Sequence, residues 1–227
     1  MASATLAGST GLVGSHILSQ LLAHPSLTSI YAYTRRELPN PSASAKLLPL
    51  QSSDTAQWPS IFPRESKPNI FFSALGTTKA AAGSFDAQRK IDYDLNVDLA
   101  KAAKEAGVET YVLISAASAS STAYFAYPRM KGELEEAIKA MGFKHTVFVR
   151  PGLIQGDRTE SRPAEAVIRG IAKGLRSLTP KATDFWAQDA SVIGRAAIKA
   201  GVMCVEGKRE GGVWVMGQSE IVELGRE

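Results

Sequence analysis

The sequence has very little cysteine and histidine. Cys204 is the only cysteine among the 227 residues, and the three histidines are scattered along the chain. A single thiol cannot form an intramolecular disulfide, and no cysteine or histidine spacing fits a zinc site. We therefore expect no metal, and a reducing compartment is the simpler expectation.

Long apolar runs and blocks of one charge are also absent. No uninterrupted apolar stretch approaches the roughly 20 residues that span a bilayer. The net charge of +4 is spread along the chain. No basic block is interleaved with aromatic residues, so the composition gives no support for nucleic-acid binding. The hydrophobic content of 44% and the charged content of 21% are typical of a soluble globular protein.

Residues 1–34 contain no acidic residue and many Ser, Thr and Ala residues, as a mitochondrial transit peptide does. Such a peptide also needs Lys or Arg on an amphipathic helix, and the first such residue here is Arg35. Its cleavage would remove the first predicted strand and the glycine-rich turn behind it. We therefore interpret this segment as part of the folded domain.

Short apolar runs alternate with helical periodicity over the first two thirds of the chain. The expected strands are Ala4–Ala7, Ser29–Thr34, Leu47–Leu50, Asn69–Ala74, Glu109–Ser115 and Lys144–Arg150. The expected helices are Leu12–Leu22, Ser84–Ala106 and Tyr127–Met141. This alternation predicts a Rossmann-like, doubly wound α/β fold. Its mostly parallel sheet has the order 3-2-1-4-5-6 and binds a cofactor where that order reverses.

After Gly152 the pattern loosens. The expected elements there are helices at Pro163–Leu178 and Asp189–Val205, a short strand at Val213–Met216 and a last short helix from Ser219. This segment is too small for a domain of its own. We expect one domain over residues 1–227, in which residues 153–227 contribute a small substrate or lid lobe.

A glycine-rich turn is expected between the first strand and the first helix. Gly8, Gly11 and Gly14 permit a tight turn, close approach of the backbone to a diphosphate, and close packing of helix on strand. The helix N-terminus adds N–H donors. We predict a dinucleotide over Gly8, Ser9, Thr10, Gly11, Leu12, Val13 and Gly14. The alternative is a plain strand–helix turn, because the spacing departs from Gly-x-Gly-x-x-Gly.

The end of the second predicted strand is basic. An NAD-preferring site places Asp or Glu about 20 residues after the glycines to hold the ribose 2′-hydroxyl. This sequence has Arg35 and Arg36 there instead, and guanidinium groups pair well with a 2′-phosphate. We therefore favour NADP(H) over NAD(H). Glu37 keeps NAD(H) as an alternative, and two solvated arginines are the other interpretation.

Tyr127 and Lys131 stand four residues apart at the start of a predicted helix, on one face of it. A nearby ammonium lowers the pKa of a phenol, so that the tyrosine can exchange a proton near neutral pH. Asn96 on the preceding helix is a candidate to order a water near Lys131. The alternative is an exposed helix surface with no chemical role.

Together these features resemble the atypical short-chain dehydrogenase/reductases. The shared motifs are the glycine loop, Asn96, Leu113-Ile114-Ser115, Tyr127-x-x-x-Lys131 and Arg150-Pro151-Gly152. Three segments, Leu75-Gly76-Thr77-Thr78, Tyr127–Glu133 and Arg150–Pro163, more narrowly resemble the fungal "found in mitochondrial proteome, number fifty-two" family and the related human Tat-interacting 30-kDa protein. The resemblance covers essentially the whole chain.

The resemblance implies roles for particular residues. Tyr127 is expected to be the catalytic acid, and Lys131 to bind the nicotinamide ribose and tune Tyr127. Pro151 and Gly152 are expected near the nicotinamide. At the adenosine end the expected contacts are Asp54, Ala74, Leu75 and Gly76.

One position departs from the family pattern. Such families usually have a serine that polarises the substrate carbonyl, often the second of a Ser-Ser pair, whereas this chain has Ser115-Ala116 followed by Ala117-Ser118. Ser115 is the candidate, with Ser118 as the alternative.

The resemblance implies an NADPH-dependent oxidoreductase of unknown carbonyl or alcohol substrate, peripheral on the cytosolic face of the mitochondrial outer membrane. Because of the displaced serine, the alternative is a catalytically weak or inactive cofactor-binding scaffold or regulator on the mitochondrial surface.

The predicted helix Pro163–Leu178 combines an apolar face with Arg169, Lys173 and Arg176. Such a helix can rest on an anionic membrane. Its apolar stripe is modest, so we favour a lid helix that packs on the domain.

Overall fold

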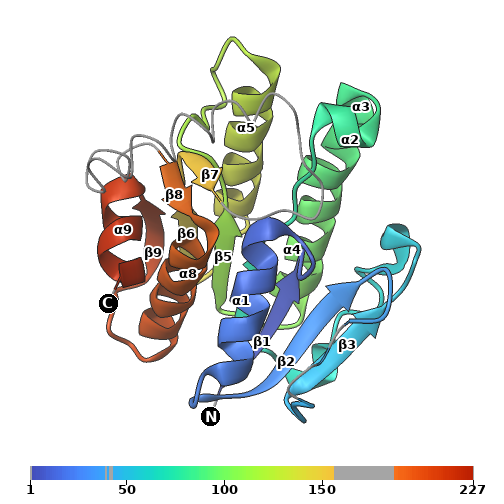
Figure 1. Ribbon diagram of the computed structural model, residues 1–227, viewed down its shortest axis with the longest axis vertical. Helices are drawn as coiled ribbons and strands as arrows, with labels where there is room; N and C mark the ends of the chain where they lie inside the picture. The colour runs from blue at the N-terminus through green and yellow to red at the C-terminus, as the bar shows by residue number, and fades with distance from the viewer. Residues whose placement is uncertain (1, 39, 41–42, 156–186, 227) are drawn as a thin grey trace.

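The computed structural model describes residues 2–38, 40, 43–155 and 187–226, and its centre is a parallel sheet flanked by helices (Figure 1). The strands are β1 (Ala2–Ala7), β2 (Leu27–Thr34), β3 (Leu47–Gln51), β4 (Ile70–Ser73), β5 (Thr110–Ile114), β6 (His145–Val149), β7 (Leu153–Gln155), β8 (Ala187–Asp189) and β9 (Gly212–Met216). The α-helices are α1 (Leu12–Ala23), α2 (Lys79–Ala82), α3 (Phe85–Arg89), α4 (Asn96–Glu105), α5 (Ala126–Ala140), α8 (Ala190–Val205) and α9 (Gln218–Arg226). Two short 3₁₀ turns, η1 (Thr55–Gln57) and η2 (Arg64–Ser66), and a π-helical segment, η3 (Lys90–Leu95), complete the described elements.

The main sheet has the order β3-β2-β1-β4-β5-β6-β9, and every neighbouring pair is parallel. The prediction of a Rossmann-like doubly wound fold is confirmed, and β9 adds a seventh strand to the predicted order. The order reverses between β1 and β4, which is where such sheets bind ligands. Ala7 pairs with Ser73 and Ser73 with Leu113, so the loops after these three strands leave the sheet side by side.

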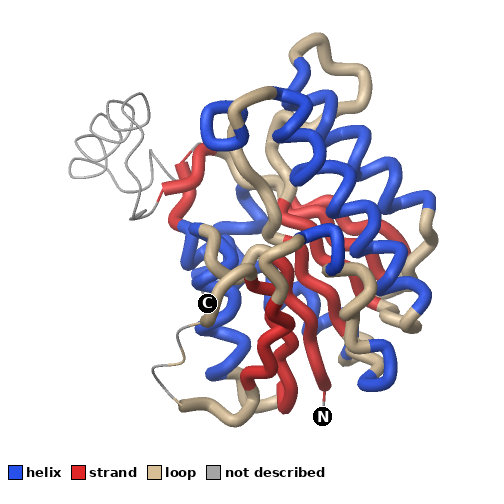
Figure 2. The backbone as a smooth tube through the Cα atoms, turned by 90° about the vertical axis from the view of Figure 1, so that its right-hand side faces the viewer, coloured by secondary structure: helices blue, strands red, loops and turns tan. Residues whose placement is uncertain are grey.

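Both faces of the sheet are covered, as the buried strands require. Every residue of β4, β5 and β6 is buried, and such strands need helices on each side. Helices α1, α8 and α9 pack together on one face, while α4 and α5 lie on the other. Figure 2 shows the strands in red between these two layers of helices.

The described part of the C-terminal segment belongs to the main domain more closely than the sequence suggested. Trp214 and Met216 of β9 are buried, which makes β9 a sheet strand. In α8, a Cβ at Gly201 would lie 3.0 Å from the Phe72 ring, so the missing side chain lets this helix approach the sheet. Beyond the main sheet, β7 and β8 form a separate two-stranded pair. The predicted helix at residues 163–178 lies outside the described residues.

The structure agrees with the expected elements at the N-terminus and in β3, and differs from them in the long helix predicted from Ser84. The interpretation of residues 2–34 as folded is confirmed, because they form β1, α1 and β2. The long helix predicted from Ser84 is present as α3 and α4, but η3 interrupts it with a wider π-helical turn. Pro49 lies in β3, where the missing N–H does little harm because β3 is an edge strand.

Candidate functional site

Most of the predicted site residues lie in loops that directly follow strands. Gly8 follows β1, Arg35 follows β2, Ala74 follows β4, Ser115 follows β5, and Pro151 lies just after β6. Because all these strands are parallel, their carboxyl ends meet at one edge of the sheet. The structure therefore brings together groups that lie far apart in the sequence.

Two of the three glycines in the first loop are required by packing within the chain. Gly8 has a φ of +86°, and a Cβ there would lie 2.5 Å from the Ala74 carbonyl oxygen. A Cβ at Gly14 would lie 1.9 Å from the carbonyl oxygen of Gly8. Gly11 differs, because its Cβ would meet only the Gly8 oxygen at 3.2 Å and the Ala74 oxygen at 3.9 Å. Packing within the chain hardly requires glycine at position 11, whereas close approach of a ligand to the backbone of the loop does require it.

The start of α1 is suited to an anion. Gly11 is its N-cap residue, no side chain caps the helix, and its first turn contains no acidic residue. The first N–H groups of a helix lack partners within the helix and carry a partial positive charge. An anion lying over Gly11 would satisfy these donors and meet no repelling carboxylate.

The hydroxyl of Ser9 has a structural role that the sequence did not reveal. It donates a 2.7 Å hydrogen bond to the carbonyl oxygen of Tyr33, and Ser9 is buried. Tyr33 in turn donates to the carbonyl oxygen of Trp58, and the two rings stack with centroids 5.1 Å apart. This chain of contacts ties the glycine loop to the end of β2. Ser9 can therefore offer a ligand its backbone but not its hydroxyl group.

Arg35 and Arg36 are exposed just beyond β2. Among the described residues, neither guanidinium group has a hydrogen bond or ion pair. Glu37 beside them is exposed as well. Asp54 is exposed after β3, and one of its carboxylate oxygens accepts a 2.9 Å bond from the Ala56 N–H, which caps η1. The two arginines are thus available for an anionic group beyond the end of β2.

Asp92 holds the loop that contains Leu75 and Gly76, a role that no sequence motif indicated. It lies on η3 and is 2% exposed. Its Oδ1 accepts a 2.7 Å bond from the Thr77 N–H, and its Oδ2 accepts a 3.4 Å bond from Gln88. Burial raises the pKa of this carboxyl group, while the Thr77 N–H and the Lys131 ammonium oppose that rise. Asp92 lies in a π-helical turn, and such turns are frequent at functional sites. This signal is visible only in the structure and not in the sequence.

Tyr127 and Lys131 lie in the first turns of α5, and both are electrostatically coupled to Asp92. Lys131 is 3% exposed and donates a 3.2 Å bond to the carbonyl oxygen of Ile114. Burial lowers its pKa, and the carboxylates of Asp92 and Glu135 partly restore it. These contacts direct the ammonium towards the end of β5.

The expectation that Lys131 lowers the pKa of Tyr127 is wrong. Tyr127 is 42% exposed, yet desolvation around its hydroxyl group raises its pKa, and the Asp92 carboxylate raises it further. Burial contributes more to this rise than the carboxylate does, and both favour the neutral phenol. Tyr127 therefore keeps its proton at neutral pH, a state that suits an acid.

Ser115 is not available to polarise a substrate carbonyl. It is 6% exposed, and its hydroxyl group donates to the carboxylate of Glu135. The same carboxylate accepts hydrogen bonds from Nε and Nη2 of Arg150, which joins all three residues in one network around the buried Glu135 carboxylate. The alternative, Ser118, is exposed, and its hydroxyl group has no hydrogen bond to a described residue. The catalytic role predicted for Ser115 is therefore not supported.

Asn96 also differs from its predicted role. It is fully buried, and its side-chain amide donates to the carbonyl oxygens of Ile91 and Asp92, each at 3.1 Å. Its oxygen accepts a bond from the Ser73 hydroxyl group. Both amide hydrogens are used within the protein, so Asn96 stabilises the π-helical turn and β4 instead of ordering a water near Lys131.

The turn Pro151-Gly152 is held by partners on both sides. The carbonyl oxygen of Pro151 accepts a 2.9 Å bond from the Ala117 N–H. The Gly152 N–H donates to Gln188 of β8 at 3.3 Å, and Gln188 donates to the Gln218 carbonyl oxygen at 2.9 Å. Gln188 is 2% exposed and was not expected from sequence, because its partners lie far from it along the chain.

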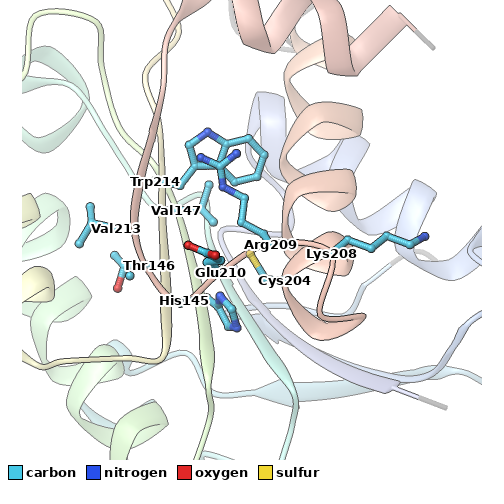
Figure 3. A pocket seen from close by; sticks show the side chains of 11 residues that line it. His145, Thr146, Val147, Cys204, Lys208, Arg209, Glu210, Val213 and Trp214 are labelled. Carbon is cyan, nitrogen blue, oxygen red and sulfur yellow. The ribbon is translucent and has the colours of Figure 1, made fainter.

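A cavity among the described residues lies elsewhere. Its volume is about 390 Å³, and it opens at the amino ends of β6 and β9, opposite the loops described above. Figure 3 shows His145, Cys204, Arg209 and Trp214 around it, and the Arg209 guanidinium lies 3.8 Å from the centre of the Trp214 ring. It contains none of the predicted site residues, so we place the functional site at the carboxyl edge.

In residues 2–38, 40, 43–155 and 187–226, no three His, Cys, Asp or Glu side chains come together as a metal site needs. Among the helices of the described ranges, none is long and apolar enough to cross a membrane.

We expect Asp92→Asn to lower the pKa of Lys131, because the substitution removes a carboxylate that favours the ammonium. NMR titration of labelled lysine side chains checks this, with Lys131→Met to assign the signal. Burial already depresses this pKa, so folding gains stability as the pH rises through the window between the folded value and 10.5. Asp92→Asn should widen that window towards lower pH.

The matched control is Asp98→Asn, which removes an exposed carboxylate paired with Lys101 on α4. It should leave the titration of Lys131 unchanged. An unchanged Lys131 midpoint in Asp92→Asn would show that Asp92 serves only to hold the loop at Thr77.

Comparison with known proteins gives a consistent picture. Residues 8–173 match a family described as NAD(P)H-binding. "Protein fmp52-1, mitochondrial" of Aspergillus terreus is 51% identical over 100% of both chains. "Protein fmp-52, mitochondrial" of Neurospora crassa is 46% identical over 99% of this chain and 96% of its own.

Solved structures share the fold at much lower identity. The UDP-Glc/GlcNAc 4-epimerase of Campylobacter jejuni superimposes with a TM-score of 0.69 at 16% identity, covering 98% of this chain and 82% of its own. MoeE5 in complex with UDP-glucose and NAD gives a TM-score of 0.66 at 17% identity, covering 98% and 80%. At such identities the likeness concerns the fold alone.

Proposed function

We propose a function from one premise: this chain belongs to the NAD(P)H-binding family, and within it to the fungal mitochondrial Fmp52 proteins. The protein is an NADPH-dependent oxidoreductase. Its substrate is a carbonyl compound or the corresponding alcohol. The kinship with the short-chain dehydrogenase/reductases and with the human Tat-interacting 30-kDa protein stays a prediction from the sequence motifs.

One observation carries the proposal. The start of α1, which suits an anion, lies at the same edge of the sheet as the acid Tyr127 and the buried amine Lys131. The start of α1 has free N–H donors over Gly11, which fits the diphosphate of a dinucleotide. Arg35 and Arg36 fit the extra phosphate of NADP(H). Tyr127 and Lys131 fit the nicotinamide end, beside the Pro151-Gly152 turn that is tied to the loop after β5.

When bound, a nicotinamide cofactor supplies the hydride for reduction, or accepts it for oxidation. In the reducing direction Tyr127 donates its phenolic proton to the carbonyl oxygen, so that C=O becomes CH–OH, and solvent returns a proton to Tyr127. Burial and, secondarily, the Asp92 carboxylate raise the pKa of Tyr127, so that the resting phenol holds the proton it donates. Lys131, whose ammonium bonds the Ile114 carbonyl oxygen at the end of β5, is placed to bind the nicotinamide ribose.

The second candidate function is a cofactor-binding scaffold or regulator with little turnover. It is favoured by the bond from Ser115 to Glu135, which leaves no serine hydroxyl fixed for a substrate carbonyl at the end of β5. The two candidates share the dinucleotide site and differ only in chemistry. Turnover, measured beside cofactor binding, separates them.

Tyr127→Phe is expected to reduce kcat/KM about 10²- to 10⁴-fold, because it removes the proton that the carbonyl oxygen takes up. NADPH affinity should stay unchanged, since the phenol hydroxyl is not part of the diphosphate site. NADPH oxidation with a panel of aldehydes and ketones, beside calorimetric NADPH titration, measures both. Tyr31→Phe on β2, a part-buried tyrosine that bonds Ser66, is the control. Wild-type protein that binds NADPH tightly and reduces nothing in the panel would favour the scaffold.

Arg35→Ser combined with Arg36→Ser is expected to weaken NADPH binding about 10- to 100-fold, equivalent to about 1.4–2.7 kcal/mol. NADH binding should change little, because NADH lacks the 2′-phosphate. Calorimetric titration with each nucleotide measures the ratio. Lys101→Ser, an exposed cation on α4, is the charge control. Equal affinities of the wild type for NADPH and NADH would remove the role we give to the two arginines.

The proposed location is the cytosolic face of the mitochondrial outer membrane, with the protein held peripherally. Support comes from the names of the relatives, which call them mitochondrial, and from the family resemblance of the motifs. The helix predicted from sequence at residues 163–178, considered above for membrane contact, lies outside the described residues. Release from isolated mitochondria by alkaline carbonate tests peripheral attachment, and protein retained in the membrane pellet would contradict it.

A further inference from the structure

Three aromatic residues are exposed at the start of α5. Tyr124 is 90% exposed, Phe125 is 72% exposed and Tyr127 is 42% exposed. Elsewhere in the described ranges, the large hydrophobic residues that are exposed are all aliphatic. Full burial of one such ring gains roughly 1.5–3 kcal/mol, so a protein seldom leaves adjacent rings in water, and exposed apolar clusters mark binding sites.

The loop that presents these rings is anchored, not loosely attached. The Ser120 N–H donates a 3.1 Å bond to the carbonyl oxygen of Pro128. At Gly132 a Cβ would lie 2.1 Å from backbone atoms of Ser120 and Ser121, so glycine lets α5 pack directly on the loop. The rings of Tyr124 and Phe125 meet edge to face with centroids 5.5 Å apart. The pair is therefore held on a supported stretch of backbone.

This loop is next to the proposed chemistry. Its first part bonds the Pro151 carbonyl oxygen through the Ala117 N–H, and its last part leads within two residues to Tyr127. Figure 1 shows the loop before α5 at the top of the molecule, beyond the carboxyl end of β5. A substrate that approaches from solvent and places its oxygen at the Tyr127 hydroxyl group would therefore lie beside this loop.

The loop also lacks charge. Residues 116–128 contain no Asp, Glu, Lys, Arg or His. A substrate with a phosphate or carboxylate near this loop would lose hydration without gaining an ionic partner from the loop, which is costly. An uncharged compound with an apolar body would instead cover the exposed rings and gain by doing so.

We propose that Tyr124 and Phe125, here called the aromatic ridge, bind the apolar part of the substrate, and that the substrate is an uncharged apolar carbonyl compound or its alcohol. This inference rests on the proposed function. The reaction is RCHO + NADPH + H⁺ → RCH₂OH + NADP⁺. Hydride adds to the carbonyl carbon, and Tyr127 supplies the proton to the oxygen.

The experiment compares 4-methylbenzaldehyde with 4-carboxybenzaldehyde, two aldehydes of similar shape that differ in charge. NADPH oxidation gives kcat and KM, and saturation-transfer NMR on the NADP⁺-loaded protein gives binding without turnover. We expect the wild type to prefer the methyl compound at least about tenfold in kcat/KM. Tyr124→Ala combined with Phe125→Ala should raise KM for this compound about tenfold with kcat nearly unchanged, because the ridge contributes uniform binding. Leu48→Ala, which removes an exposed aliphatic side chain on β3, should change neither constant.

Several outcomes separate the ridge from the proposed function. If neither aldehyde is reduced, but NMR shows the methyl compound bound and the double variant releases it, the ridge stands and the oxidoreductase proposal fails. If both aldehydes are reduced equally well, or the double variant keeps the wild-type KM, the ridge proposal is overturned. Co-sedimentation with phosphatidylcholine–phosphatidylserine vesicles then measures membrane binding by the wild type and by the double variant. Vesicle binding that is lost in the double variant, with KM unchanged, identifies the ridge as a lipid contact and also overturns the proposal.

Discussion

Gly14→Ala should destabilise the protein severely, whereas Gly11→Ala should leave it folded and impair only nucleotide binding. The new Cβ at residue 14 would lie 1.9 Å from the carbonyl oxygen of Gly8, which is backbone and cannot rotate away. Either α1 or the loop must move, and we expect a loss of about 3 kcal/mol or more in the free energy of unfolding. Urea denaturation without nucleotide measures this loss.

Gly11→Ala has a different expected result because the space above Gly11 belongs to the ligand. The nearest atom to its Cβ would be the Gly8 oxygen at 3.2 Å, a contact that a small shift relieves. As an N-cap substitution it should cost no more than about 1 kcal/mol of stability. NADPH affinity should fall at least about tenfold, because the methyl group lies where the diphosphate must approach the backbone.

Gly217→Ala is the matched control for both variants. Gly217 also precedes a helix, α9, but a Cβ there meets no atom within 4 Å. This variant should keep both the stability and the NADPH affinity of the wild type. If Gly11→Ala bound NADPH as tightly as the wild type, the diphosphate could not rest on this loop, and the proposed cofactor site would have to be abandoned.

The fold was predictable because its signals are local. The strands of the centre are short apolar runs, and the helices between them carry helical periodicity and end near glycine, so their order follows from the sequence. The loops after parallel strands then meet at one edge, which is why Gly8, Arg35 and Ala74 could be grouped before any coordinates. The edge strand β9 could be recognised as a strand, but its place beside β6 depends on packing of residues far apart in sequence.

The finer roles within the site were not predictable, because they depend on partners that are distant in sequence. Ser115 looked like a catalytic serine until its hydroxyl group proved to bond Glu135, twenty residues away. Asp92 had no motif of its own, yet it joins the Thr77 loop to Tyr127 and Lys131. A burial pattern predicts which side chains are inside, but not which polar atoms meet there.

The network of Ser115, Glu135 and Arg150 is expected to make a large contribution to the free energy of unfolding. The Glu135 side chain is 4% exposed, and Arg150, 30% exposed, supplies two of its hydrogen bonds. Arg150→Met should cost about 3 kcal/mol of stability, because it takes from a buried carboxylate the guanidinium group that supplies two of its hydrogen bonds. Glu135→Leu should cost less, because Arg150 can turn its guanidinium towards water.

The double variant Arg150→Met/Glu135→Leu should recover most of that loss and remain within about 1–2 kcal/mol of the wild type, since only the Ser115 hydroxyl group then lacks an acceptor. Urea denaturation of the four proteins gives the coupling energy of the pair, and Lys101→Met at the exposed pair with Asp98 should show almost no effect. NADPH affinity should survive in the double variant if the network is structural. Loss of NADPH binding despite recovered stability would instead mean that Glu135, the second carboxylate acting on Lys131, sets the charge that the cofactor meets.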